Sequence, residues 1–405
     1  MKKCLHGLIP LSILTIFCGH RALGQQIDAK IAQKWNKIFD SISQNNPLPA
    51  FYVAMVDKGG ICYRYAHGKE IWAKDKALNE NSIFRIYSMT KAITTVSVMQ
   101  LVEKGKVLLD EPMDKWLPDM IEIPILRDDG SLVKSNKTIT LRQLLTHTSG
   151  FAYSFLNPKL LNFKKPADWR YKDFPRIAEP GVRFCYGTSL DWVGKLIERI
   201  SGKSLEEYVE ENICKPLGMN RTFFTVPDSL IGDIVSFGHV AGDKFTSDEA
   251  WQLNRAEIKP KEFNGGGGLF GTVHDYGKFV QCILDGGTLN GNEILQRSTL
   301  DGMFTNQIGD LWLQFDKLSG PTFLADTNST LLGHDKFGLG WAIDVTGRDG
   351  LPRGNMYWGG LANTFFDIDP KGGRAVLLFS NVLPWGNKYC TSIYFKALQT
   401  IYSLK

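Results

Sequence analysis

Two kinds of hydrophobic periodicity alternate along this chain, and together they predict a mixed α/β architecture. Short apolar runs typical of strands occur at residues 51–56, 61–66, 338–345, 364–368 and 375–380. Asp57-Lys58-Gly59-Gly60 separates the first two runs, and Asp369-Pro370-Lys371-Gly372-Gly373 separates the last two. Both linkers are typical of hairpin turns, so we expect antiparallel pairing near each end of the chain.

Longer segments with apolar residues at helical spacing predict helices at 27–42, 88–104, 190–200, 273–284 and 389–402. Gly105 and the pair Ser201-Gly202 are typical helix stops. Residues 109–255 carry several helical patterns but no convincing paired strands. The pattern therefore predicts an α+β fold, in which an antiparallel sheet flanked by helices is formed by both chain ends (25–105 and 256–405). A mostly helical domain (106–255) is inserted between them.

The first 24 residues have the pattern of a secretory signal. Lys2 and Lys3 precede an apolar stretch at residues 8–18, and Ala22-Leu23-Gly24 supplies small residues at a cleavage position. The stretch is too short to span a bilayer, so an uncleaved anchor is disfavoured. We expect a mature chain that begins near Gln25, is exported (periplasmic or extracellular) and is not stably inserted in a membrane.

Composition excludes several classes of function. The net charge of +5 falls to about +2 without the three basic residues of the signal, and no Lys/Arg cluster suggests a nucleic-acid partner. Five of the seven cysteines lie outside the signal, widely scattered, which predicts buried free thiols rather than disulfides or a zinc site. The histidines have no metal-ligand spacing, so we expect neither a metal nor an organic cofactor.

Ser88 and Lys91 are the strongest candidates for chemistry. They open a predicted helix, and positions i and i+3 share a helix face, so the Lys91 ammonium can approach the Ser88 hydroxyl. Unpaired N–H groups at a helix N-terminus favour a deprotonated oxygen there. This arrangement is what a serine acyl-transfer enzyme requires, although serine and lysine also occur together in helices by chance.

Two later segments complete the candidate site. Tyr186 stands just before a predicted helix and could act as general base beside Lys91, since an ammonium favours the phenolate form; a packed aromatic is the alternative. Trp358-Gly359-Gly360-Leu361 precedes a strand, where two glycines allow a substrate carbonyl to approach closely. The Leu361 and Ser88 N–H groups could then form an oxyanion hole, and a simple turn is the alternative.

Other conspicuous residues favour structural roles. The run Asn264-Gly265-Gly266-Gly267-Gly268 lacks the phosphate-binding patterns and predicts a tight turn. The aromatic residues at 151, 153, 155 and 169 lie in a long irregular segment. We expect them to pack in the core, and the more specific alternative is that they line the rim of a hydrophobic acyl pocket.

The order S-x-x-K, tyrosine motif and W-G-G resembles the serine β-lactamase and penicillin-binding-protein superfamily. More narrowly, the chain resembles class C β-lactamase-related serine hydrolases, with their family VIII carboxylesterases and lovastatin-type acyltransferases. Residues 144–150 (LLTHTSG), 186–194 (YGTSLDWVG) and 215–219 (KPLGM) also match in order. The resemblance implies that Ser88 is acylated, that Lys91 relays a proton, and that Tyr186 is the general base and acid. Leu361 would supply the second oxyanion N–H, and His147 would be structural.

Departures from the family pattern bear on the substrate. Trp358 stands where β-lactamases and transpeptidases carry a Lys or His, and Thr188 stands where class C enzymes carry an Asn. Both changes favour neutral esters over β-lactams. We therefore expect a secreted serine hydrolase that cleaves small-molecule carboxylic esters through a Ser88 acyl-enzyme. An acyltransferase with the same site, a β-lactamase or D-Ala peptidase, and a non-catalytic binding protein on the same fold remain alternatives.

Overall fold

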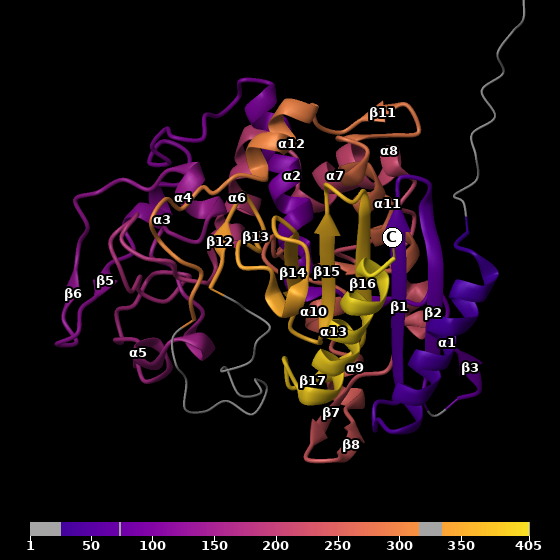
Figure 1. The fold of residues 1–405 in the computed structure, drawn as a ribbon. Helices are drawn as coiled ribbons and strands as arrows, with labels where there is room; N and C mark the ends of the chain where they lie inside the picture. Colours follow the sequence, from indigo (N-terminus) through magenta and orange to yellow (C-terminus); the bar gives the residue numbers. More distant parts are fainter. Residues whose placement is uncertain (1–25, 73, 316–333, 405) are drawn as a thin grey trace, which may run out of the picture.

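One large antiparallel sheet organises the molecule. The computed structural model describes residues 26–72, 74–315 and 334–404. Within these ranges, eight strands pair in the order β12-β13-β14-β15-β16-β1-β2-β3 (Figure 1). Their bounds are β1 Ala50–Asp57, β2 Gly60–Ile71, β3 Lys76–Ala77, β12 Lys336–Phe337, β13 Ala342–Ile343, β14 Met356–Gly360, β15 Thr364–Asp369 and β16 Arg374–Phe379. Because β1 pairs with both β2 and β16, the two ends of the chain meet inside the sheet, as predicted.

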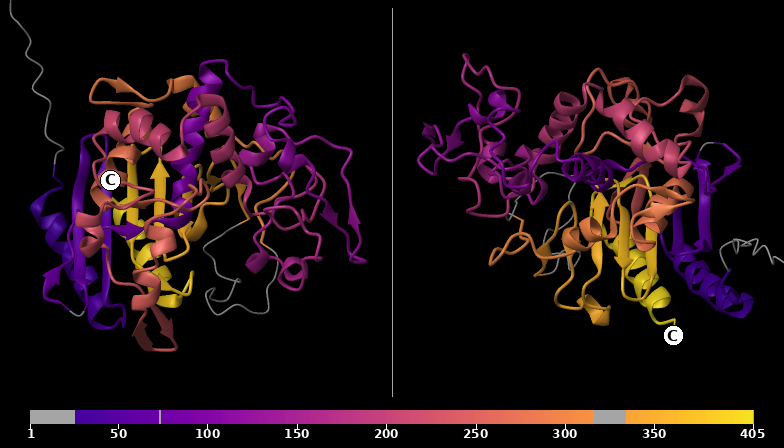
Figure 2. Two further views of the ribbon diagram at one scale, coloured as in Figure 1. Left: turned by 180° about the vertical axis from the view of Figure 1, so that it is seen from behind. Right: turned by 90° about the horizontal axis from the view of Figure 1, so that it is seen from above.

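Both faces of the sheet are covered by helices, and strand β1 shows this most clearly. Its residues Tyr52, Ala54 and Val56 point into the core shared with α2 (Thr90–Glu103) and α11 (Val273–Leu284). The alternate residues Phe51 and Val53 point toward α1 (Ala29–Gln44) and α13 (Lys388–Tyr402). A strand covered on both faces has a nearly continuous apolar sequence, as β1 does. Figure 2 shows the resulting three layers.

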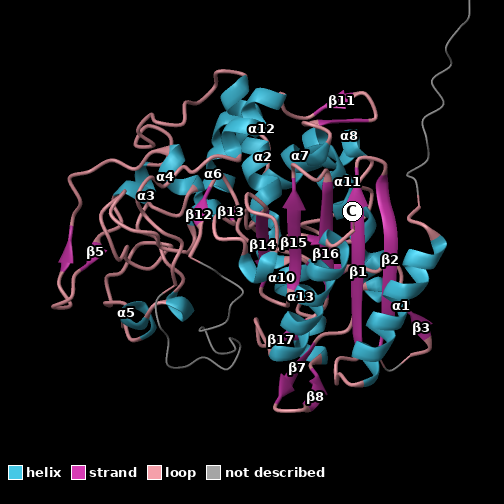
Figure 3. Cartoon of the chain, in the orientation of Figure 1, coloured by secondary structure: helices cyan, strands magenta, loops and turns pink. Residues whose placement is uncertain are grey.

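The segment between β4 and β9 is mostly helix and loop (Figure 3). Besides α2, its α-helices are α3 Pro118–Ile121, α4 Leu141–Leu145, α5 Pro158–Leu161, α6 Ser189–Ser201, α7 Leu205–Val209, α8 Lys215–Leu217, α9 Glu249–Gln252 and α10 Arg255–Ile258, and α12 (Arg297–Met303) follows later. β4 (Phe84–Arg85) and β9 (Phe270–Gly271) pair with each other at the junction with the sheet. The boundaries of an inserted domain at 106 and 255 stay a prediction.

Helix α2 is buried along most of its length, from Thr90 to Leu101. It packs against α6, which ends at Gly202 in the left-handed conformation that favours glycine. The predicted helices at 27–42, 88–104, 190–200, 273–284 and 389–402 are confirmed with shifts of a few residues at their ends. Burial on all sides fixes α2 rigidly, and this is the helix that follows Ser88.

Two strand predictions were wrong. Residues 109–255 do contain paired strands: β5 (Ile125–Leu126) with β6 (Leu132–Val133), and β7 (Gly238–Ala241) with β8 (Lys244–Ser247). β7 also pairs in parallel with β17 (Val382–Leu383), a partner far away in the sequence that local periodicity does not reveal. The single strand expected at 338–345 is interrupted, because residues 338–341 form a tight turn in which the Gly338 N–H donates to the Trp341 carbonyl.

The five cysteines at 62, 185, 214, 282 and 390 are free and buried, as predicted. Cys4, Cys18 and the predicted signal segment lie outside the described residues. Among the helices of the described ranges, none combines the length and apolar character that a membrane span requires.

Candidate active site

Ser88 and Lys91 lie together at the start of the central helix. A single 3₁₀ turn (Tyr87–Met89) carries Ser88 and leads directly into α2. Lys91 Nζ is 3.0 Å from Ser88 Oγ, which confirms the contact expected from their i, i+3 spacing. The Lys91 side chain is only 1% exposed, whereas Ser88 lines a cavity. The hydroxyl is therefore open to a ligand while the lysine beside it is enclosed.

Among the described residues, the Lys91 ammonium has three hydrogen-bond partners, and all of them are neutral groups. Besides Ser88, Nζ lies 3.1 Å from Tyr153 Oη and 2.5 Å from the Gly266 carbonyl oxygen. Neither contact was predicted. Tyr153 was assigned to core packing or a pocket rim, and the glycine run only to a turn, which the structure confirms at 265–267. Each partner lies far from Lys91 in the sequence and belongs to irregular backbone, so no local motif identifies it.

Tyr186 presents the face of its ring, rather than its hydroxyl, to the Lys91 ammonium. Lys91 Nζ is 4.8 Å from the centroid of the Tyr186 ring. The Tyr186 hydroxyl instead accepts a hydrogen bond from the indole N–H of Trp358, with 3.2 Å between Nε1 and Oη. No hydrogen bond joins Tyr186 to Ser88 among the described residues. The structure thus brings all four predicted side chains together and gives Trp358 a partner that the sequence did not suggest.

The backbone around Ser88 is shaped for close approach. Tyr87 has a φ of +41°, in the left-handed region that non-glycine residues adopt at a cost of about 1–3 kcal/mol. Gly360 of β14 packs directly on this segment, because a Cβ there would lie 2.3 Å from the Ile86 carbonyl oxygen. Leu361 lines the same cavity as Ser88. The N–H groups of Ser88 and Leu361 donate no hydrogen bond within the described chain, so both remain available, and the oxyanion hole stays a prediction.

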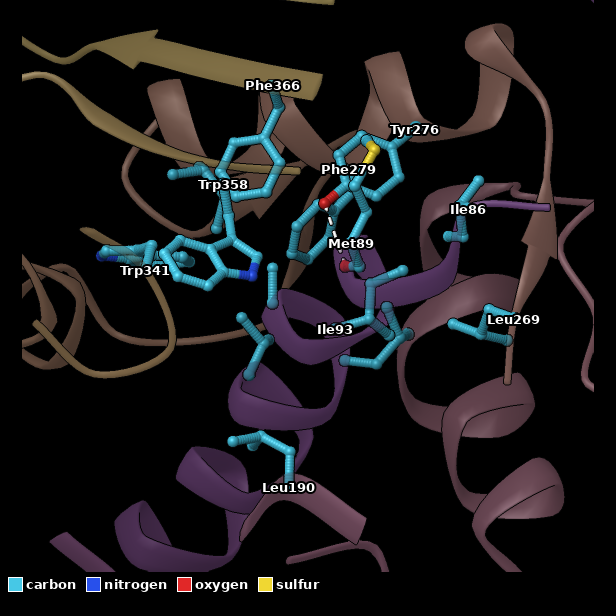
Figure 4. Close-up of a cluster of buried hydrophobic side chains, with 14 of the residues drawn as sticks. Ile86, Met89, Ile93, Leu190, Leu269, Tyr276, Phe279, Trp341, Trp358 and Phe366 are labelled. Carbon is cyan, nitrogen blue, oxygen red and sulfur yellow. Dashed lines mark hydrogen bonds between the residues drawn. The ribbon is translucent and has the colours of Figure 1, made fainter. Parts of the chain in front are cut away.

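The cavity above Ser88 has a volume of about 540 Å³ and mostly apolar walls. Gly359 and Gly266 contribute backbone to it. Aromatic and aliphatic side chains dominate the lining, among them Tyr87, Tyr153, Phe155, Leu156, Tyr186, Leu313, Phe315, Trp358, Leu361 and Trp385. A pocket of this size and polarity accommodates a drug-sized apolar ligand. Figure 4 shows Trp358 in the same buried cluster as Met89 and Ile93 at the beginning of α2.

Of the predicted rim aromatics, Tyr153 and Phe155 line the cavity. Phe151 is 1% exposed and packs in the core, and Trp169 packs against Phe163 and Tyr171 outside the cavity. The rim hypothesis was therefore wrong for Phe151 and Trp169. Their wide spacing along an irregular segment gave no signal of which rings would face Ser88.

Thr188 does not line the cavity above Ser88. Its hydroxyl donates to the carboxylate of Asp173, and it lines a separate cavity of about 820 Å³. Asp173 also accepts the indole N–H of Trp192 at 3.3 Å. Burial raises the pKa of Asp173, and these hydrogen bonds oppose that change. The side chain at position 188 is therefore engaged with the protein rather than with a ligand above Ser88.

His147 packs against the catalytic tyrosine candidate. Its ring centroid is 4.7 Å from that of Tyr186, in an edge-to-face arrangement. Burial and the nearby Lys91 charge hold the pKa of His147 well below its usual range, so the imidazole is neutral near pH 7. The sequence-based expectation of a structural role agrees with this environment. Among the described residues, no cluster of His, Cys, Asp and Glu has the arrangement of a metal site.

Comparison with known proteins places this geometry in a family context. A family model described as Beta-lactamase matches residues 35–400. Monacolin J acid methylbutanoyltransferase from Aspergillus terreus is 30% identical over 92% of this chain and 96% of its own. Lovastatin esterase from Penicillium rubens is 29% identical over 72% and 77%, respectively. The solved structure of unliganded simvastatin synthase from Aspergillus terreus superimposes with a TM-score of 0.79 at 27% identity, covering 93% of this chain and 99% of that one.

Proposed function

Because this chain belongs to the beta-lactamase family, we propose that it is a serine enzyme that cleaves carboxylic esters through an acyl group held on Ser88. One observation carries the proposal: Ser88 Oγ lies 3.0 Å from the buried Lys91 ammonium, at the wall of an apolar cavity. The relatives named above include a methylbutanoyltransferase and an esterase, both of which are names for enzymes of acyl chemistry. The predicted catalytic residues Ser88, Lys91 and Tyr186 therefore have a common task.

The reaction proceeds in two halves. In the first, the Ser88 hydroxyl gives its proton to the Lys91–Tyr186 pair, and Oγ attacks the ester carbonyl carbon. The N–H groups of Ser88 and Leu361 receive the negative charge on the carbonyl oxygen. The alcohol then leaves with a proton from Tyr186. In the second half, water repeats these steps on the acyl-enzyme and releases the acid.

The same acyl-enzyme can deliver its acyl group to an alcohol instead of water. The relative with 30% identity over most of both chains is named as a methylbutanoyltransferase, and this favours acyl transfer as the second candidate function. Hydrolysis and transfer share the first half-reaction and differ only in the acceptor. A β-lactamase or D-Ala peptidase is less well supported, because Trp358 is neutral and Thr188 is bonded to Asp173.

Mass spectrometry of the intact protein tests the proposal. After brief exposure to p-nitrophenyl butyrate, the wild type should gain one butyryl group, and the Ser88→Ala variant should gain none. Ser97→Ala is the matched control, since Ser97 is a buried serine of α2 whose hydroxyl donates to the Ile93 carbonyl of its own helix. Acylation of Ser88→Ala at the wild-type rate would contradict the assignment. Adding an alcohol and measuring butyrate against butyryl ester then separates hydrolysis from transfer.

We also propose that the protein is exported. The support is the sequence pattern of residues 1–24, with paired lysines, a short apolar stretch and small residues before Gln25. Expression of the full chain in a bacterial host, followed by N-terminal sequencing of the soluble protein, should give a chain that begins near Gln25. A chain that retains Met1 in the cytoplasm would contradict it.

A further inference from the structure

A half-buried carboxylate contacts the loop that holds Lys91. Asp191 lies in the first turn of α6, five residues after Tyr186. Its Oδ1 accepts the Gly266 N–H at 2.7 Å, and the carbonyl of that same glycine accepts the Lys91 ammonium at 2.5 Å. Gly266 is thus held on one side by a carboxylate and on the other by the lysine.

The packing at this point leaves little freedom. A Cβ on Gly266 would lie 2.4 Å from Asp191 Oδ1 and 3.2 Å from Tyr153 Oη, so both side chains crowd the glycine. Asn264 Oδ1 also accepts the Gly266 N–H, at 2.8 Å. Because the turn is clamped from several sides, the direction of its carbonyl, and with it the position of Lys91 Nζ, depends on these contacts.

The charges around Lys91 also connect it with Asp191. Lys91 forms no ion pair with any described carboxylate, and its direct partners are neutral. A buried ammonium needs a compensating charge nearby. Burial raises the pKa of Asp191 to about 6, and the attraction of Lys91 opposes that rise more than any other group does. Asp191 is therefore the carboxylate that is electrostatically coupled to the lysine.

We propose that Asp191 is a positioning residue, whose carboxylate orients Lys91 through the Gly266 turn and whose charge retains the proton on the Ser88–Lys91–Tyr186 unit. The inference rests on the proposed function, since it gives Asp191 a task within that reaction. Asp191 itself touches no reacting atom. It lines the second cavity of about 820 Å³ and not the cavity above Ser88.

The titratable groups around Asp191 come from several segments. Lys91 stands on α2. Tyr153, Lys172, Asp173, Tyr186, Lys195 and Glu262 lie around the same region, and Asp119, Glu122, Arg170, Tyr171 and Arg199 also line the cavity beside Asp191. Asp173 repels the Asp191 carboxylate, and Lys172 attracts it more weakly than Lys91 does. Lys172 and Lys195 both pair with Glu262, whereas Lys91 pairs with no described carboxylate.

The pH dependence of kcat/KM on p-nitrophenyl butyrate tests the inference. Asp191→Asn keeps an oxygen for the Gly266 N–H but removes the charge. The proton acceptor of the reaction must then lose its proton more readily, so the acidic limb should move to lower pH by more than ~0.5 unit. Asp191→Ala removes the contact as well, and kcat should fall about 10- to 100-fold through misplacement of Lys91.

Asp275→Asn is the matched control. Asp275 is a buried carboxylate that accepts the Arg221 backbone N–H at 2.6 Å, away from Ser88. This variant should lose stability without moving the acidic limb. An Asp191→Asn profile identical to the wild-type profile would overturn the inference. Mass spectrometry of the intact protein distinguishes the two proposals. If the wild type forms no Ser88 adduct, the proposed function fails. If the adduct forms but the acidic limb of the Asp191→Asn profile does not move, only the role of Asp191 is refuted.

Discussion

The hydrogen bond from Trp358 to Tyr186 gives a quantitative test of how the tyrosine works. Trp358 is 5% exposed, and its Nε1 lies 3.2 Å from Tyr186 Oη. A hydrogen bond to a charged group contributes about 1.5–3 kcal/mol, and one between neutral groups about 0.5–1.5 kcal/mol. Since 1.36 kcal/mol corresponds to tenfold in rate, loss of the bond should cost about 10- to 150-fold if Tyr186 Oη carries negative charge in the transition state.

Trp358→Phe is the variant that isolates this bond. It keeps an aromatic ring but removes the N–H donor. We expect kcat/KM on p-nitrophenyl butyrate to fall by about 10- to 150-fold, the range for a hydrogen bond to a charged oxygen. If the bond acts through Tyr186, the double variant with Tyr186→Phe should be no slower than Tyr186→Phe alone. A Trp358→Phe enzyme within twofold of the wild type, or a double variant in which the two losses multiply, would refute the reasoning.

Trp341→Phe controls for the loss of indole volume. Trp341 is fully buried and donates its own indole N–H to the Met303 carbonyl at 3.2 Å, but it does not line the cavity. Both tryptophan variants should lower the melting temperature, because each leaves a void in a packed core. Only Trp358→Phe should reduce kcat/KM by tenfold or more.

Three further outcomes are expected. Tyr153→Phe removes one hydrogen-bond partner of the Lys91 ammonium, so kcat/KM should fall by about tenfold, while mass spectrometry of the intact protein should still detect acylation of Ser88. An unchanged rate would show that Tyr153 does not contribute to the reaction. The wild type should hydrolyse neutral short-chain esters far better than penicillins, because the indole at 358 offers a carboxylate no charge; efficient penicillin turnover would restore the β-lactamase alternative. His147 stays neutral in the folded protein, whereas the unfolded chain takes up a proton, so the free energy of unfolding should fall as the pH drops below about 6.5. Urea titrations at several pH values should show a weaker decline for His147→Asn, and equal slopes would contradict this.

The parts of the site that the sequence predicted are those fixed by local geometry or by a motif. Ser88 and Lys91 are one helical turn apart, so their spacing alone indicates the contact that the structure has at 3.0 Å. Tyr186 and Trp358 were singled out from their local sequence, and the family resemblance then supported them. Their mutual hydrogen bond spans 172 positions, and no pattern encodes it.

What the sequence did not reveal depends on tertiary packing. Tyr153 approaches Lys91 from irregular backbone, where periodicity carries no information about direction. Asp191 entered the sequence analysis only as part of the matching stretch 186–194, and only the fold places it against Gly266. The same holds for β7, whose parallel partner β17 lies near the other end of the chain. Helices and hairpins, which are set by nearest neighbours, were predicted correctly in most cases.

The central position of β1 has a consequence for the order in which the protein can fold. Tyr52 pairs with Phe379, so the sheet cannot close until nearly the whole chain has been made. At about 5–20 residues per second, the ribosome synthesises β16 tens of seconds after the β1–β2 hairpin, which has no partner on its β16 side until then. During this interval α1 can already cover one face, since Trp35 and Phe39 contact Tyr63 of β2. The opposite face and the β16-pairing edge of β1 stay open, and a nascent chain stalled before β16 would present an apolar strand to its neighbours.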